Sequence, residues 1–529
     1  MKSAPALGQK SAPAAGPAPE PALSNGLRRY LYLTAATTGA VIMIVEILGA
    51  KMLSPYVGMS HFVWTAQIAV TLVALACGYY AGGRLADRTQ RLSPLYWAIL
   101  GAAGYLVLTV LICEPVAYWC LDFNLAFGSL LASTILFFVP LALLAMTAPF
   151  LVRVLTSSVA GVGGNVGRLT AVSTLGSFAG TMAIGYLMIP LMPNSFAMYT
   201  AAVVLVLACA GYFGFFARRY GPPLLGLLLL AVAGVASLYQ SRPREYRNVV
   251  ELFRRNSHFG ELQVVDLRDG YCRFYLDDNL IQNTYDPKLR QSESTFTYML
   301  SYMAAAYNTN INDALCIGLG IGVVPMDFAR RGARVDVVEI NPPVEEVARR
   351  FFNLQPHKLH ITFDDARHYL NRCHKKYDAV VLDAFLGDSS PSHLFTREAF
   401  ASMARVLRPG GVLVINCFAE LDEGRDFFAT SLNKTLKTVF PGVVARTSGT
   451  GAMFFMATDH PHPMVLRQPD FESVHIEARR DTSIAFDSIV EISTAHGRVL
   501  TDDYNPVEFY DARNREEIRR RLAMRARDM

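Results

Sequence analysis

The stretch ALCIGLGIGVVPMDFARRGARVDVVE, residues Ala314–Glu339, decides how the second half of this chain folds. It opens with an apolar run, Ala314–Ile317, and enters a loop with glycine at every second position: Gly318, Gly320 and Gly322. A helical pattern and a second apolar run, Arg334–Glu339, follow. Glycines let a backbone pass close to a ligand, and this order of segments is typical of a βαβ unit that binds a nucleoside or dinucleotide.

The residues that follow continue the alternation of strands and helices. Helical patterns such as Pro343–Phe352 and Arg397–Leu407 separate the apolar runs. The candidate strands are Ala314–Ile317, Arg334–Glu339, Leu359–Phe363, Ala379–Asp383 and Gly411–Asn416. Such alternation predicts a parallel sheet covered by helices. We therefore expect a Rossmann-like α/β domain over residues 311–529.

A shorter β pattern precedes this domain. Residues 241–250 are polar and contain a proline, so we expect a linker there. The candidate strands are Glu261–Leu267, Cys272–Asp277 and Asn279–Asn283, with a hairpin turn at Asp269-Gly270 between the first two and a helix at Arg290–Ala306 after them. The sequence predicts a small β region with a lead helix over residues 245–310.

Acidic side chains follow three of the predicted strands. Glu339 ends the second strand, where a carboxylate accepts hydrogen bonds from both hydroxyls of a ribose. Asp364-Asp365-Ala366 ends the third, where an acid suits the amino group of adenine, and Asp383 ends the fourth. The loop and Glu339 suit either NAD or a sulfonium nucleoside, and Asp365 favours the nucleoside. The structural alternatives are a tight turn for the loop and a helix N-cap for Asp383.

The first 240 residues differ from the rest in composition. Residues 1–28 are rich in Ala and Pro, and we expect a disordered tail. Residues 29–240 hold seven apolar runs, each near the roughly 20 residues that cross a bilayer. These runs are Tyr30–Leu53, Val63–Leu85, Pro94–Trp119, Leu125–Leu151, Leu169–Leu191, Phe196–Ala217 and Pro222–Tyr239. We predict an α-helical transmembrane domain with about seven helices and a lipid bilayer as partner.

The side of the membrane stays open. Arginines follow the second, fourth and sixth runs, for example Arg88, Arg153 and Arg218, which places those connections and the N-terminus in the cytoplasm. An odd number of spans then puts the C-terminal half outside. Sulfonium nucleosides are made inside, so either the count or the expected side is wrong.

Charge and cysteine content exclude other classes. The net charge of +5 comes without a long Lys/Arg tract, which argues against nucleic-acid binding. The eight cysteines form no C-x-x-C pair and no zinc spacing with histidine, so we predict no metal site and small buried cysteines.

Together the motifs resemble those of the spermidine synthases, the aminopropyltransferases. The stretches that carry the resemblance are Asp278…Gln282, Gly318–Gly322, Val338-Glu339-Ile340-Asn341, Asp364-Asp365-Ala366 and Tyr377…Asp383. They fall within residues 261–440. A multi-span region before such a domain is similar to bacterial membrane-fused spermidine synthase-like proteins, which implies a multi-pass protein of the bacterial inner membrane.

The resemblance implies roles by position. Asp383 is the catalytic acid that orients and deprotonates the attacking amine. The nucleoside site comprises Gln282, Gly318, Gly320, Gly322, Glu339, Asp365, Ala366 and Pro391. The substrates implied are a polyamine and decarboxylated S-adenosylmethionine as co-substrate, with no other cofactor. A homo-oligomer stays open.

The chain also departs from that family. Ile321 stands where the glycine-rich loop usually has an acid, and Leu386 stands where a second acid normally follows the catalytic one. The candidate replacements for amine binding are Asp388, Asp502, Asp503, Tyr504 and Glu508. The alternative for the last four is an acidic turn broken by Asn505-Pro506.

Three functions remain in this order. The first is aminopropyl transfer to putrescine or a similar diamine. The second is S-adenosylmethionine-dependent methyl transfer, because Ile321 removes an acid that would repel the methionine carboxylate. The third is a polyamine or nucleoside sensor or transporter, motivated by Glu46 in the first span and by Gly82–Arg88, which resembles a loop of major-facilitator transporters. A small-residue turn with basic flanks explains Gly82–Arg88 with fewer assumptions and is the preferred interpretation.

Overall fold

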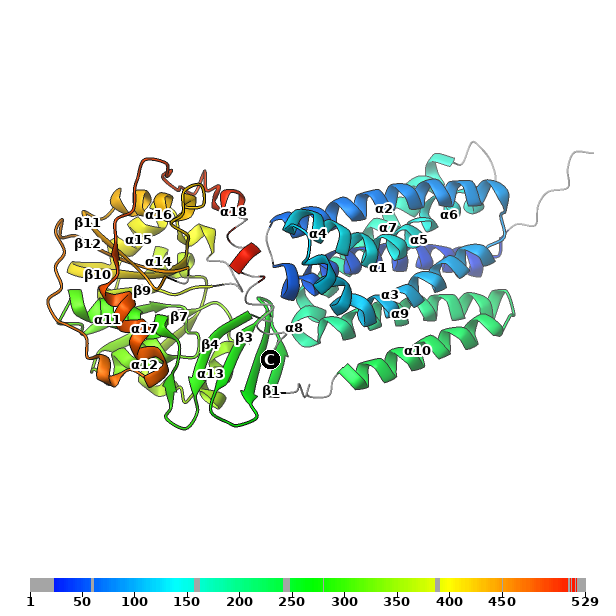
Figure 1. Cartoon of the computed structure of the whole chain (residues 1–529). Coiled ribbons are helices and arrows are strands. Elements are labelled where there is room, and N and C mark those ends of the chain that lie inside the picture. The colour runs from blue at the N-terminus through cyan, green and yellow to red at the C-terminus, as the bar shows by residue number, and fades with distance from the viewer. Residues whose placement is uncertain are drawn as a thin grey trace, which may run out of the picture.

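The protein has two halves, a helical bundle and an α/β unit (Figure 1). The computed structural model describes residues 23–58, 61–156, 162–240, 248–278, 280–385, 391–449, 451–511, 514, 516–518 and 520. We call residues 23–240 the helical half and residues 248–520 the α/β half. Figure 1 shows the chain entering the bundle at the end that faces away from the α/β half.

The helical half contains long helices, three of them with π-helical turns inside. Its elements are α1 (Asn25–Val57), α2 (His61–Arg88), α3 (Ser93–Cys120), α4 (Leu125–Ser133), η1 (Thr134–Phe138), α5 (Val139–Ala145), α6 (Thr147–Leu155), α7 (Val162–Met182), η3 (Ala183–Met188), α8 (Ile189–Leu191), α9 (Asn194–Gly211), η4 (Tyr212–Phe216) and α10 (Gly221–Gln240).

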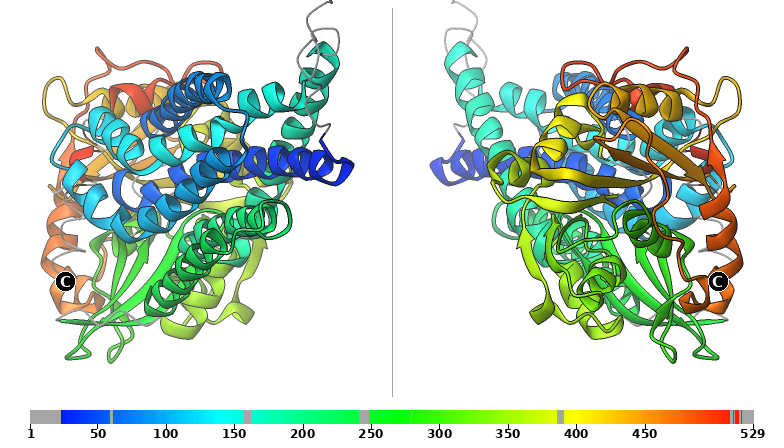
Figure 2. Two further views of the ribbon diagram at one scale, coloured as in Figure 1. Left: turned by 90° about the vertical axis from the view of Figure 1, so that its right-hand side faces the viewer. Right: turned by 90° about the vertical axis from the view of Figure 1, so that its left-hand side faces the viewer.

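Six stretches of the described chain are long and apolar enough to cross a membrane. They are Asn25–Val57, Phe62–Arg88, Ser93–Cys120, Leu125–Leu155, Val162–Leu191 and Asn194–Phe216. The seventh predicted run forms α10, but its apolar part, Gly221–Ala236, is shorter. Figures 1 and 2 show α10 at the edge of the bundle. Each of the seven predicted apolar runs is therefore helical in the structure. Only six of them are long and apolar enough to cross a membrane.

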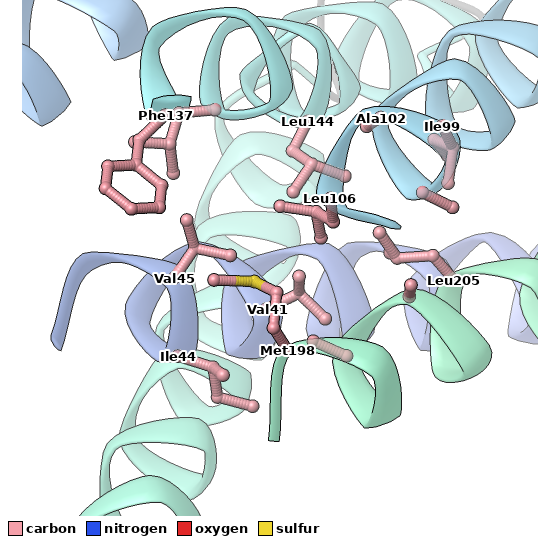
Figure 3. Packing of buried hydrophobic residues seen from close by; sticks show 14 of the residues in the cluster. Val41, Ile44, Val45, Ile99, Ala102, Leu106, Phe137, Leu144, Met198 and Leu205 are labelled. Carbon is pink, nitrogen blue, oxygen red and sulfur yellow. The ribbon is translucent and has the colours of Figure 1, made fainter. Parts of the chain in front are cut away.

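The core of the bundle is apolar and closely packed. Val41 and Val45 of α1 meet Leu106 of α3, Phe137 of η1 and Met198 of α9 (Figure 3). Small residues let two helices approach so closely that a larger side chain would have no room between them. A Cβ on Gly176 of α7 would lie 2.1 Å from the Ala36 carbonyl oxygen. A Cβ on Gly82 would lie 2.5 Å from the Met146 oxygen, which supports helix packing as the role of that glycine.

The outer face of the bundle carries large apolar side chains. Leu72, Leu175, Tyr186, Phe215 and Leu224 are each more than half exposed. A water-soluble protein rarely exposes so many large apolar residues on neighbouring helices. This surface fits contact with lipid acyl chains.

The α/β half begins with a five-stranded antiparallel sheet. Its strands are β1 (Val249–Asn256), β2 (Glu261–Leu267), β3 (Arg273–Asp277), β4 (Leu280–Asp286) and β5 (Gln291–Ser292), and α11 (Thr295–Tyr307) follows. The predicted small β region with a lead helix is present. The predicted linker ran to residue 250 and missed β1, whose three charged residues hide its alternation.

An eight-stranded sheet follows, in the order β13-β11-β12-β10-β9-β6-β7-β8. Its elements are β6 (Asp313–Ile317), α12 (Val323–Arg330), β7 (Arg334–Glu339), α13 (Pro343–Phe351), β8 (His360–Phe363), α14 (Ala366–Arg372), β9 (Tyr377–Leu382), α15 (Arg397–Val406), β10 (Leu407–Phe418), α16 (Phe427–Lys437), β11 (Gly442–Thr447), β12 (Ala452–Thr458), α17 (Ile476–Asp487), β13 (Ile489–Val490) and α18 (Val507–Tyr510).

The five strands predicted from sequence form the parallel part of this sheet. The prediction missed β11, β12 and β13, which pair antiparallel at one edge. Strand β6 lies between β7 and β9, so the strand order reverses there. Ligands of such sheets bind beyond the carboxyl ends of the strands at this reversal.

The last described residues return to the bundle. The Arg520 guanidinium donates hydrogen bonds to the carbonyl oxygens of Leu121 and Phe123 in the α3–α4 connection. Glu517 accepts a hydrogen bond from Arg425. The described residues near the C-terminus therefore contact both halves of the protein.

Candidate active site

A cavity of about 140 Å³ lies at the carboxyl ends of the parallel strands. Strands β6, β7 and β10 of the large sheet and β3 and β4 of the small sheet contribute side chains, as do the residues that directly follow β8 and β9. The polar residues that line it are Asp277, Gln282, Asn283, Glu339, Asn341, Asp364, Asp365, Asp383, His393 and Asn416. The strand tips therefore converge as the sequence predicted.

The glycine-rich loop closes the cavity at β6. Gly318 has φ +98°, and a Cβ there would lie 2.1 Å from the carbonyl oxygen of Asp383. Only glycine fits where β6 and β9 come this close. Gly318 and Gly320 line the cavity. Gly322 has φ +84° and is the N-cap of α12, so among the described residues it supports the loop without lining the cavity.

Glu339 ends β7 and is 8% exposed. Its Oε2 accepts a hydrogen bond from the Leu319 N–H at 2.9 Å, and its Oε1 accepts one from the Asn341 N–H at 2.8 Å. Burial raises the pKa of this carboxyl, and the backbone N–H donors oppose that rise. The side chain is thus fixed toward the cavity, with lone pairs left to accept from a ligand.

Asp383 follows β9 directly. Its N–H donates to the Ile317 carbonyl oxygen at 2.9 Å, and its Oδ1 accepts from Asn416 Nδ2 at 2.9 Å. Burial raises the pKa of Asp383 to about 6, and the Asn416 hydrogen bond holds it from rising further. A carboxyl whose pKa lies near neutrality both accepts and releases a proton at physiological pH.

Asp365 has a structural contact as well as a place at the cavity. Its Oδ1 accepts from the N–H groups of Arg367 and His368, which caps α14. Its Oδ2 lies 3.1 Å from His393 Nε2. Ala366, Pro391 and His393 line the same wall. The predicted nucleoside residues other than Gly322 are therefore brought together.

The sequence did not single out Asn283, Asn341 or the aromatic residues of the cavity as site residues. Asn283 and Asn341 are 6% and 4% exposed, and their Oδ1 atoms have no hydrogen-bond partner in the described part of the chain. The aromatic lining consists of Phe259, Tyr275, Phe296, Phe385 and Phe418. At the wall of a cavity, such buried acceptors are available to a ligand or a water that supplies N–H or O–H groups. No sequence spacing marks these residues, because they come from separate strands and loops.

The predicted amine residues near the C-terminus lie elsewhere. Asp502 pairs with Arg367 at 2.5 Å and accepts from Thr396 Oγ1 at 2.6 Å. Glu508 Oε1 accepts from Ser392 Oγ at 3.4 Å. Asp503 and Tyr504 are exposed, and the Tyr504 hydroxyl is bonded to Arg498. None of these four residues lines the cavity described, and Arg367 already neutralises Asp502, so their contact with an amine stays a prediction. Asp388 lies outside the described residues.

One group outside the cavity has metal-like spacing. The ligand atoms of Asp286, Glu293 and His475 lie within 4.8 Å of one another. His475 Nδ1 accepts from the Glu477 N–H, so its Nε2 carries the proton and donates to Asp286 Oδ2 at 3.4 Å. That tautomer has no free lone pair for a metal. The group ties the small sheet to α17.

Carboxylates and glycines at the tips of a parallel sheet define a Rossmann-like enzyme domain of the nucleoside-binding type. A family model described as the spermine/spermidine synthase domain matches residues 293–462. The polyamine aminopropyltransferase of Vibrio vulnificus is 30% identical over 224 residues, which cover 40% of this chain and 74% of that protein.

Two further proteins are similar to parts of this chain. A probable polyamine aminopropyl transferase of Bifidobacterium longum is 25% identical over 278 residues, covering 48% of this chain and 61% of that protein. A probable spermidine synthase from Corynebacterium glutamicum has a TM-score of 0.39 at 17% identity, covering 48% of this chain and 96% of that structure. The chain belongs to the spermine/spermidine synthase family and is an enzyme of the aminopropyltransferase type.

Proposed function

We propose that this protein transfers the aminopropyl group of decarboxylated S-adenosylmethionine to putrescine or a similar diamine. The products are spermidine, or the corresponding longer amine, and methylthioadenosine. Asp383 carries the proposal: it lines the same cavity as Glu339 and Asp365, and its pKa of about 6 suits a general base.

The proposed chemistry balances without a metal or redox group. The diamine is cationic at neutral pH, and an ammonium nitrogen has no lone pair for attack. The Asp383 carboxylate takes one proton from it, and the freed amine attacks the propyl carbon next to sulfur. The new C–N bond forms as the C–S bond breaks, and sulfur leaves as a neutral thioether. One proton is released overall.

The remaining residues have positioning roles in this proposal. Glu339 accepts from the ribose hydroxyls and Asp365 faces the adenine. The free Oδ1 atoms of Asn283 and Asn341, with Asp277 nearby, offer acceptors to the ammonium groups. They replace the C-terminal acids as the proposed amine site.

Product analysis tests the proposal. The full chain in detergent, given putrescine and decarboxylated S-adenosylmethionine, should release methylthioadenosine and spermidine in equal amounts. Absence of both products would overturn it. Calorimetry with the carboxylated nucleoside is the second arm: tighter binding of S-adenosylmethionine than of its decarboxylated form would favour methyl transfer instead, which the apolar Ile321 allows.

We further propose that the helical half spans the bacterial inner membrane. The six apolar stretches and the large exposed apolar side chains support this location. Membranes from cells that express the chain should retain it after alkaline carbonate extraction, and its release into the soluble fraction would contradict the proposal.

A further inference from the structure

The small sheet touches the helical half at two turns. At the β1–β2 turn, Asn256 Nδ2 donates to the Met192 carbonyl oxygen at 3.4 Å and to Asn194 Oδ1 at 3.2 Å. At the β3–β4 turn, the Ser54 hydroxyl of α1 donates to Asp278 Oδ2 at 3.0 Å. Figure 1 shows the end of the bundle near α8 facing this sheet.

The Ser54 contact is buried and anionic. Ser54 is 1% exposed and Asp278 is 4% exposed. The hydroxyl also lies 3.0 Å from the Lys51 carbonyl oxygen, its partner within the helix. A carboxylate is the stronger acceptor, so the hydroxyl hydrogen is directed to Asp278.

Asp278 is held from two sides in an unfavourable backbone conformation. Its Oδ1 accepts from the Glu261 N–H at 2.8 Å, while Ser54 holds Oδ2. Its φ of +46° lies in the left-handed region, which residues other than glycine adopt at a cost in free energy. Such a conformation persists only where its surroundings fix it. Helix α1 therefore helps to fix the β3–β4 turn.

Both turns also form the cavity wall. Asp277, next to Asp278, lines the cavity, and so does Phe259 of the β1–β2 turn. Ser257 Oγ in that turn accepts from Asn341 Nδ2 at 3.0 Å, which orients the unpartnered Asn341 Oδ1. The two turns pack without slack: a Cβ on Gly260 would lie 2.1 Å from Asp277 Oδ1. Ser54, Asp278 and Asp277 therefore connect helix α1 to the wall that carries the proposed amine acceptors.

We propose that Ser54 is a positioning residue for the aminopropyl transfer. Through Asp278 it sets the cavity wall that receives the diamine, so the helical half is part of the active-site scaffold as well as an anchor. The inference rests on the proposed function, because its kinetic test measures aminopropyl transfer.

The test compares Ser54→Ala with Ser177→Ala. Ser177 donates to the Gly39 carbonyl oxygen at 3.1 Å inside the bundle and serves as the matched control. In Ser54→Ala, kcat/KM for the diamine should fall about 10-fold, since small misplacements of reacting groups cost this much or more. Nucleoside affinity should stay within about 2-fold of wild type. Ser177→Ala should change neither value.

The double variant Ser54→Ala/Asp278→Asn separates positioning from general weakening. If the pair acts as a unit, the double variant should lose little more activity than either single variant. Unchanged kcat/KM in Ser54→Ala, or equal losses in the Ser177→Ala control, would overturn the inference.

Hydrogen exchange keeps the inference testable apart from catalysis. Amides of β3 and β4 should exchange faster in Ser54→Ala than in Ser177→Ala, and no difference would overturn the coupling. If wild type forms no methylthioadenosine while this exchange difference is present, the proposed function fails and the structural coupling stands.

Discussion

Buried polar groups differ between the two halves. In the helical half, Lys51 and Gln67 are 6% and 0% exposed, and Lys51 Nζ and both Gln67 side-chain polar atoms have no partner in the described residues. In the α/β half, the unpartnered amide oxygens of Asn283 and Asn341 lie at a cavity. The unpartnered groups of the α/β half therefore lie where a ligand can reach them. The apolar packing of the helical half tolerates a few buried polar groups without partners. In the α/β half, groups of this kind lie together at the wall of one cavity.

The largest expected effect comes from removing the proposed base. Asp383→Asn should lower kcat by about 100-fold or more, because the amine then keeps its proton. Nucleoside affinity should change little. Product formation and calorimetry measure the two quantities. Asp481→Asn, an exposed acid on α17, should leave both unchanged. Retained turnover in Asp383→Asn would show that another residue is the base. The cavity would then no longer be distinguished from the helical half by a catalytic carboxylate.

Glu339→Ala should lower the affinity for the nucleoside more than it lowers kcat. Loss of the proposed ribose contacts should weaken binding of the sulfonium nucleoside by about 10-fold to 100-fold, as expected for lost hydrogen bonds to a charged group. Calorimetric titration checks the affinity, and kcat at saturating nucleoside checks the rate. Equal losses of rate and affinity in the Glu339 and Asp383 variants would erase the division of roles.

The pH dependence follows from the pKa of Asp383 of about 6. Below that pH the carboxylate is protonated, so kcat/KM should fall about 10-fold for each further pH unit. The stability effect has the opposite sign. Because folding raises this pKa, the contribution of Asp383 to stability is present below its ordinary value and is lost as pH rises through 6.

Asp383→Asn should therefore stabilise the α/β half at pH 8 by about 1–3 kcal/mol, and the gain should vanish near pH 4. Thermal unfolding midpoints of variant and wild type at both pH values check this. A variant less stable than wild type at pH 8 would show that the carboxylate is well solvated in the cavity.

The smallest expected effect concerns the helical half. Lys51→Met removes a buried side chain whose polar Nζ has no partner within the described residues, so the bundle should become more stable by about 1–2 kcal/mol. Thermal unfolding in detergent measures it, and kcat should not change. A destabilised or inactive variant would mean that Lys51 has an anionic ligand, and the helical half would then resemble the α/β half.

The sequence determined much of this protein by local patterns. Apolar runs of spanning length give the helices of the bundle, and alternating runs that end in acids give the parallel strands. Glu339 and Asp383 were found because a residue after an apolar strand must lie at the strand tip. Strands β1 and β11–β13 were missed because charges or edge pairing obscure their period.

Only the tertiary structure decided which polar groups share the cavity. Asn283, Asn341 and Asn416 are ordinary amides in the sequence, and their roles depend on strands that pair across long chain separations. The acids at Asp502–Glu508 looked suited to an amine, but Arg367 lies beside Asp502 after folding. Hydropathy depends on consecutive residues, so it can be read along the chain. A binding site depends on residues that are distant in the sequence, and only the packing of the whole chain brings them together.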